Sequence, residues 1–163
     1  IYNCHGDFNI GTLGRTGSCL GVRSVYTIGR RKFDKRTLVG SHNYTDINRM
    51  DSEALEPDPV MWFQERKMFP VFIEQGGTDI DSYDFRQLFR VGDDALIPCL
   101  VVGSECDGLP QELIDLFPNA PRLTIGQPGL VRSFNVACAG SMAMERLYYA
   151  YRRSVMDRYG LDA

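Results

Sequence analysis

The sequence has no long apolar run, few histidines and no closely spaced cysteine pair. No stretch approaches the roughly 18 consecutive apolar residues that a membrane-spanning helix needs, so we expect no membrane association. No basic segment followed by an apolar one opens the sequence, so we expect no signal peptide. His5 and His42 stand beside five cysteines without a Cys-x-x-Cys, a poor set for a zinc site or a disulfide framework. We therefore expect no metal, and a location in the cytoplasm or another reducing compartment, an organelle included.

An excess of basic residues is also missing. The 18 Lys and Arg are outnumbered by 21 Asp and Glu, which gives a formal net charge of −3. This balance argues against a protein that wraps nucleic acid through uniform positive charge. The basic residues cluster at 30–36 and 152–153, away from acidic segments at 51–58 and 79–84. A local contact with RNA is therefore compatible with the composition.

The length and composition predict one folded domain. The chain has 163 residues, of which 44% are hydrophobic and 24% charged, so a single domain over 1–163 has a sizeable core. Short apolar runs alternate with longer amphipathic ones. This alternation predicts an α/β fold, with a mostly parallel sheet flanked by helices.

The expected elements follow from periodicity and from turn residues. Strands are predicted at 1–4, 22–28, 70–74 (closed by Gly76-Gly77), 95–102 and 122–125. Helices are predicted at 9–20, 60–68, 81–89, from Pro110 onward and at 133–153, with a helical turn at 35–40.

The first segment with chemical potential is 9–16, where a strand leads into a helix. Its glycines follow a GxxGxxG spacing, and the GxGxxG of dinucleotide-binding loops is absent, so a dinucleotide site is disfavoured. Taken alone, the segment is better explained by Asn9 as a helix N-cap and Arg15 as a solvated helix residue.

Two further segments join a strand to a helix through glycines. In 100–110, a buried strand ends in a loop that contains Gly103, Glu105 and Gly108, and strand C-termini are where open α/β sheets bind ligands. In 125–137, a Gly/Pro turn precedes the longest helix, with Ser133 as an ordinary N-cap candidate and Asn135 in an unfavourable helical position. Small residues follow in this helix, and one use for them is a subunit interface.

Taken in this order, the three segments resemble the TrmH-like branch of the SPOUT RNA methyltransferases. The family has an Asn followed six residues later by an Arg, here Asn9 and Arg15. Its GxExxGLP motif matches residues 103–110, and its Ser-Leu-Asn-Val motif matches 133–136. Phe134 replaces the usual Leu and Gly126 a common Pro, and neither change removes a polar catalytic group. The resemblance covers essentially the whole chain.

The resemblance implies a trefoil knot in the C-terminal half of the sheet, an exception to the rule that chains are unknotted. It also implies that S-adenosyl-L-methionine binds in the knot, held mainly by backbone groups and by apolar walls around the adenine. By matching positions, the candidate cofactor-binding residues are Ile73, Glu74, Gln75, Gly103, Gly108, Leu109, Ile125, Gln127, Leu130, Ser133 and Asn135.

The implied reaction is methyl transfer to a ribose 2'-hydroxyl of RNA, with tRNA as the first candidate and rRNA as the alternative. The implied catalytic residues are Asn9, Arg15, Glu105, Ser133 and Asn135. Arg15 is expected to clamp a phosphate and assist loss of the ribose proton, with Asn9 and Glu105 positioning it. The family works as a homodimer with its sites at the interface. We therefore expect the small-residue face of the last helix, with Tyr148 and Tyr151, to pack against a second subunit.

Two other functions remain open from the sequence. One is a knotted RNA-binding protein without catalytic activity, against which the complete motif set argues. The other is a nucleotide-dependent Rossmann enzyme, against which the missing GxGxxG argues.

Overall fold

The fold is described by a computed structural model that covers residues 1–2, 4–29, 32–51, 58–89 and 96–160. The first half contains α1 (Asp7–Cys19), β1 (Ser24–Ile28), the 3-10 helices η1 (Lys35–Leu38) and η2 (Ser41–Asn43), β2 (Asp46–Met50) and α2 (Pro59–Glu65). The second half contains β3 (Met68–Asp79), the 3-10 helix η4 (Phe85–Leu88), β4 (Ile97–Val102), α3 (Gln111–Asp115), β5 (Arg122–Thr124) and α4 (Val136–Tyr159).

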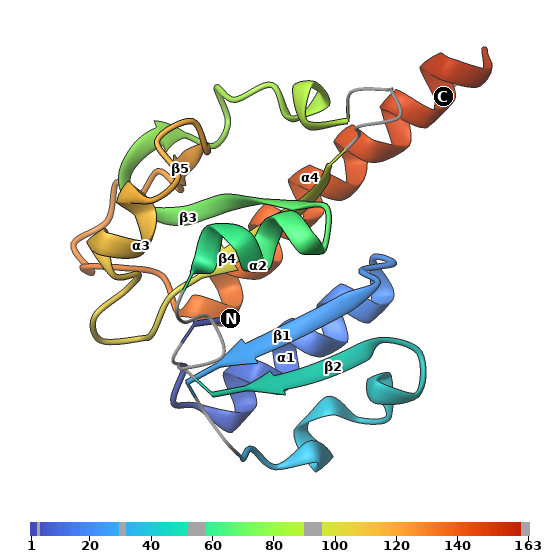
Figure 1. The fold of residues 1–163 in the computed structure, drawn as a ribbon. Helices are drawn as coiled ribbons and strands as arrows, with labels where there is room; N and C mark the ends of the chain where they lie inside the picture. The colour runs from blue at the N-terminus through green and yellow to red at the C-terminus, as the bar shows by residue number, and fades with distance from the viewer. Residues whose placement is uncertain (3, 30–31, 52–57, 90–95, 161–163) are drawn as a thin grey trace.

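The strand pairs within the described residues are all parallel. β1 pairs with β2, and β3 lies between β4 and β5 (Figure 1). Ile1 and Tyr2 join the two sheets, because the Tyr2 backbone N–H donates to the Val102 carbonyl at 2.8 Å and the Ile28 N–H donates to the Ile1 carbonyl at 2.9 Å. The predicted α/β fold with a parallel sheet and flanking helices is confirmed.

Alternating residues of the central strand build a core on each face of the sheet, as the two-residue period of a strand requires. Val71 and Ile73 pack into a cluster with side chains of α1 and α4. Phe72 faces the other way, into a cluster with Trp62 and Phe63 of α2 and with side chains of α3. The sheet is thus covered by helices on both faces, and its strand ends are left for the site.

Several predicted elements differ in detail. β3 continues through Gly76-Gly77, with a register shift against β5 between Ile73 and Thr78. The missing side chain of Gly77 lets β3 lie this close to β5, because a Cβ there would overlap the Arg122 carbonyl. The helix predicted at 81–89 is only a 3-10 turn, and the strand predicted at 1–4 is one bridge between Tyr2 and Ile28. β2 was not predicted, because its Asp-Ile-Asn-Arg-Met sequence lacks a β-branched run.

Both predicted helix caps are wrong. Gly6 caps α1, and Asn9 lies within the helix. Asn135 caps α4 by accepting from the N–H groups of Ala137 and Cys138, whereas Ser133 lies outside the helix. The small residues of α4 serve packing within the chain, since a Cβ on Gly140 would lie 2.5 Å from Leu13 Cδ2 of α1.

A cavity of about 1010 Å³ lies between the edges of β1 and β4, and Tyr148 and Tyr151 line it. Tyr151 is nevertheless 53% exposed, and Met142 and Tyr149 of the same helix are exposed as well, so the expected contact of α4 with a second subunit stays a prediction. Across the described residues, no helix is long and apolar enough to cross a membrane, and no group of three or more His, Cys, Asp or Glu is suitably placed for a metal ion.

Candidate functional site

Glu105, in the loop after β4, is held by donors from the start of the chain. Its Oε1 accepts from Asn9 Nδ2 at 2.6 Å, from the Gly6 N–H at 3.0 Å and from Cys4 Sγ at 3.0 Å. Its Oε2 accepts from the His5 N–H at 3.0 Å. Four donors around one carboxylate fix the entry into α1 against the end of β4.

These contacts set the protonation states of Glu105 and Cys4. Partial burial works against the charged form of Glu105, but the hydrogen bonds from the His5 N–H, Cys4 and Asn9 outweigh it and lower its pKa to about 2. Burial, together with the hydrogen bond to Glu105, raises the pKa of Cys4 to about 12. At neutral pH the carboxylate is therefore charged, and the thiol keeps the proton that it donates.

Asn9 carries the network onward to the last helix. Its Oδ1 accepts from Asn135 Nδ2 at 3.1 Å. The Oδ1 of Asn135 accepts in turn from the N–H groups of Ala137 at 2.8 Å and Cys138 at 3.3 Å. Glu105, Asn9 and Asn135 come from three distant segments, and the fold connects them into one chain of hydrogen bonds.

Several of the predicted cofactor residues lie where β4 ends, beside the middle of β3. Glu74 Oε2 accepts from the Leu109 N–H at 2.8 Å, which ties the middle of β3 to the loop at 103–109. Gly103 and Gly108 make this loop compact, because a Cβ on Gly103 would overlap the Gly108 carbonyl and Gly108 has a φ of +68°. Both glycines are thus required by the backbone itself.

The segment at 125–135 lies beside the same part of β3. Gln75 Nε2 donates to the Arg132 carbonyl at 3.0 Å. Ile73 is buried and Ile125 packs against the same core cluster, whereas Leu130 is fully exposed at 107%. Gln127 is half-buried and Ser133 exposed. A compact glycine loop beside the exposed apolar side chain of Leu130 fits a ligand that is bound partly through apolar contacts.

Arg15 is the predicted site residue that stands apart. It lies on the exposed side of α1 and lines a second cavity, of about 620 Å³, between α1 and the η1 region. It makes no hydrogen bond or ion pair within the part of the chain that the structure describes. The expectation that Asn9 and Glu105 position Arg15 is therefore wrong within one chain, since those residues bind each other and Asn135.

The family of the chain follows from its sequence. The profile of the SpoU rRNA Methylase family matches residues 1–145. The chain belongs to this family. It is thus an RNA methyltransferase of the SpoU type, the class whose methyl donor is S-adenosyl-L-methionine, and the resemblance to TrmH-like SPOUT proteins is confirmed. No curated protein matches the chain in sequence.

Solved structures share the SpoU fold of this chain. The TrmH/SpoU tRNA modifying enzyme of A. aeolicus has 20% identity and a TM-score of 0.73, over 95% of this chain and 75% of that one. A structure that concerns 2-OH methylation of C/U34 on tRNA has 26% identity and a TM-score of 0.70, over 93% of each chain. AviRb of Streptomyces viridochromogenes, solved with AdoMet, has 22% identity and a TM-score of 0.70, over 94% of this chain and 58% of that one.

Part of this candidate site could not be predicted from the sequence. Cys4 and the backbone N–H groups of His5 and Gly6 bind Glu105 from about 100 residues away. No spacing in the sequence signals such contacts, because backbone donors carry no residue identity. The odd cysteine count gave no indication either, since all five thiols are free.

Proposed function

We propose that the protein transfers a methyl group from S-adenosyl-L-methionine to a ribose 2'-hydroxyl of tRNA. The hydrogen-bonded chain of Glu105, Asn9 and Asn135 carries the proposal, because it unites the three motifs of the family resemblance in one site. The 26% identical structure concerned with 2-OH methylation on tRNA matches 93% of each chain and supports the same reaction. An rRNA substrate and a non-catalytic role are outcomes of the test below.

The cofactor is held by residues 73–75 of β3, the loop at 103–109 and the segment at 125–135. The glycine loop forms one wall of the cofactor site, and Ile73, Ile125 and Leu130 provide apolar contacts for the adenine. Gln75 fixes this segment through the Arg132 carbonyl. The trefoil knot expected for this region stays a prediction.

S-adenosyl-L-methionine supplies a methyl group that is already activated on a sulfonium, so the protein has to orient the ribose and remove its proton. A guanidinium is a poor base, so Arg15 is not the group that accepts the ribose proton. Its planar guanidinium instead binds a phosphate through two N–H groups and lowers the pKa of the adjacent hydroxyl. Ser133 and Asn135 order the part of the site that binds the ribose to be methylated.

The distance of Arg15 from the hydrogen-bonded chain favours a homodimer in which Arg15 acts at the partner's cofactor. The exposed side chains on α1 and α4, among them Met142 and Tyr149, are available for that contact. Five free thiols suit a reducing compartment, and we place the protein in the cytoplasm.

The test combines cofactor binding with product analysis. Titration calorimetry is expected to show binding of S-adenosyl-L-methionine, and the demethylated product is expected to raise Tm by mass action. Purified protein is then incubated with labelled cofactor and either unmodified tRNA or rRNA, and the nucleosides are analysed by mass spectrometry.

Methyl groups on ribose of tRNA are the expected result. Methyl groups on a base contradict the reaction type, and activity restricted to rRNA contradicts the substrate. Cofactor binding without turnover on either RNA supports the non-catalytic alternative, and a folded protein that binds neither ligand refutes the assignment.

A further inference from the structure

We infer that the groove between α1 and the η1 region binds a single-stranded RNA segment, with one unstacked base lying on the ring of Phe8. This inference rests on the proposed function and adds to it a contact for the nucleotide next to the reacting one.

The aromatic side of this groove is Phe8. It is 81% exposed, near the N-terminal end of α1. Phe8, Thr12 and Arg15 are spaced i, i+4 and i+7, so they share one exposed face of the helix, and all three line the groove of about 620 Å³. Phe8 and Arg15 are about 10 Å apart along the helix axis. This span suits a base on the ring and a phosphate of a neighbouring nucleotide on the guanidinium.

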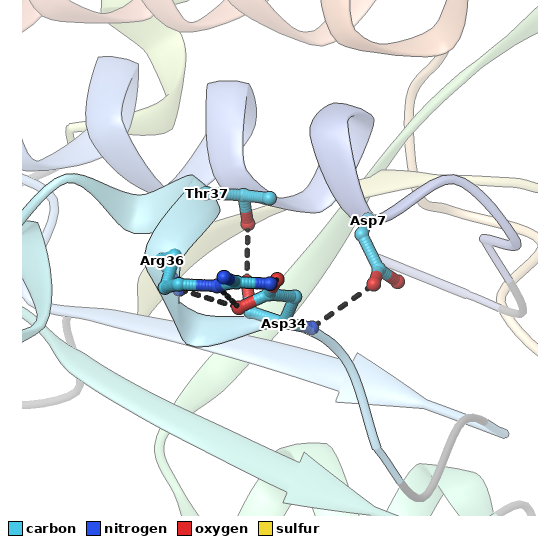
Figure 2. Close-up of polar contacts among 4 residues, drawn as sticks. All are labelled: Asp7, Asp34, Arg36 and Thr37. Carbon is cyan, nitrogen blue, oxygen red and sulfur yellow. Dashed lines mark hydrogen bonds and ion pairs between the residues drawn. The ribbon is translucent and has the colours of Figure 1, made fainter.

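The opposite side of the groove presents a second arginine that is already oriented. Arg36 Nη2 donates to Asp34 Oδ2 at 2.6 Å and its Nε donates to the same oxygen at 2.8 Å, while the Arg36 side chain is 91% exposed. Asp34 is in turn fixed by its backbone N–H, which donates to Asp7 Oδ2 at 3.0 Å, and by Thr37, whose hydroxyl donates to the Asp34 carbonyl at 2.7 Å (Figure 2). The pair therefore holds the plane of the guanidinium in place and leaves Nη1 for a ligand.

The chemistry of the groove selects RNA. Unpaired bases are recognised by stacking on aromatic rings, and their phosphates by arginine. Two arginines line the groove against one acid, Asp34, although the protein as a whole has a net charge of −3. Local positive charge beside an uncovered aromatic ring is the combination that single-stranded RNA requires.

The experiment measures binding of a fluorescein-labelled, mixed-sequence single-stranded RNA by fluorescence anisotropy. Phe8→Ala is expected to weaken binding about tenfold or more, as for the loss of one stacked base. Phe8→Leu keeps an apolar side chain without a π face and is expected to weaken binding similarly, whereas Phe8→Trp preserves it. Tyr44→Ala, at an 86% exposed tyrosine that does not line the groove, is the matched control and is expected to change nothing.

A second comparison tests the arginine. Replacing Asp34 by Asn and Arg36 by Gln together keeps the net charge and removes one phosphate contact, so the slope of log K against log salt is expected to fall by about 0.7. Phe8→Ala is expected to leave that slope unchanged. If the slope of log K against log salt is unchanged in the double variant, Arg36 does not contact the RNA.

Wild-type affinity in both Phe8→Ala and Phe8→Leu overturns the inference. If Phe8→Ala instead shifts the sedimentation from dimer to monomer while Phe8→Leu does not, the ring packs against a second copy and the inference is also wrong. Cofactor binding and methylation of whole tRNA are measured in parallel. If the wild type shows neither cofactor binding nor tRNA methylation, the proposed function is wrong. If the wild type is active and the Phe8 variants bind RNA with unchanged affinity, only the stacking of a base on Phe8 is refuted.

Discussion

Replacing Glu105 by glutamine is the sharpest test of the hydrogen-bonded chain, because it removes the charge and keeps the shape. The amide oxygen still accepts from Gly6 and Asn9, but the amide NH₂ then faces the His5 N–H, which lies 3.0 Å from the present Oε2. Two donors are thereby placed against each other. We expect the variant to fold and to be less stable.

The magnitude follows from the pKa. The pKa of Glu105 falls from the ordinary 4.5 to about 2, which corresponds to about 3 kcal/mol at roughly 1.36 kcal/mol per pH unit. The residue is exposed, so solvent screening reduces this figure, and we expect Glu105→Gln to lower the free energy of unfolding by about 1 kcal/mol at pH 7. Because the folded-state pKa is the lower one, this stabilisation is complete above about pH 4.5 and is lost as the pH falls toward 2.

Denaturant unfolding followed by the fluorescence of Trp62, the single tryptophan, measures the effect. The difference between wild type and Glu105→Gln is expected to shrink steadily between pH 5 and pH 2. Glu112→Gln, at an exposed acid on α3, is the control and should change stability by less than about 0.5 kcal/mol. Equal stability at pH 7, or a difference that persists at low pH, would refute the role of the carboxylate.

Three further changes test other parts of the site. Arg15→Ala is expected to leave cofactor binding nearly intact and to lower methyl transfer by about a hundredfold or more. Arg15→Lys should not restore the activity, because an ammonium group cannot make the two-pronged phosphate contact. Wild-type turnover of Arg15→Ala in a filter assay would exclude the phosphate clamp. Asn135→Ala removes the cap of α4 and should cost about 1 kcal/mol in thermal unfolding, whereas Asn135→Ser keeps an uncharged acceptor for the N–H groups of Ala137 and Cys138 and should recover most of it. Gly103→Ala should abolish cofactor binding measured by calorimetry, because its Cβ overlaps the Gly108 carbonyl, while Gly129→Ala, with nothing within 4 Å, should bind normally.

Much of the fold was predictable because the relevant forces are local. The apolar runs at 70–74 and 95–102 predicted β3 and β4, and the 3.6-residue period after Ser133 predicted α4. The motif order gave the family, and with it the candidate residues. Boundaries were less certain, since Gly76-Gly77 indicates a strand end by sequence and instead permits β3 to approach β5 closely.

The sequence by itself determined which polar groups the site contains, whereas only the tertiary structure decided which of them meet. Asn9 and Arg15 lie on one helix six residues apart, yet they point to different neighbours. Asn9 binds Glu105 and Asn135, and Arg15 faces the groove toward η1. The physical reason is that 3.6 residues per turn place these two side chains about 120° apart on the helix. What each side then meets depends on segments about 20 to 125 residues away, which local propensity does not encode.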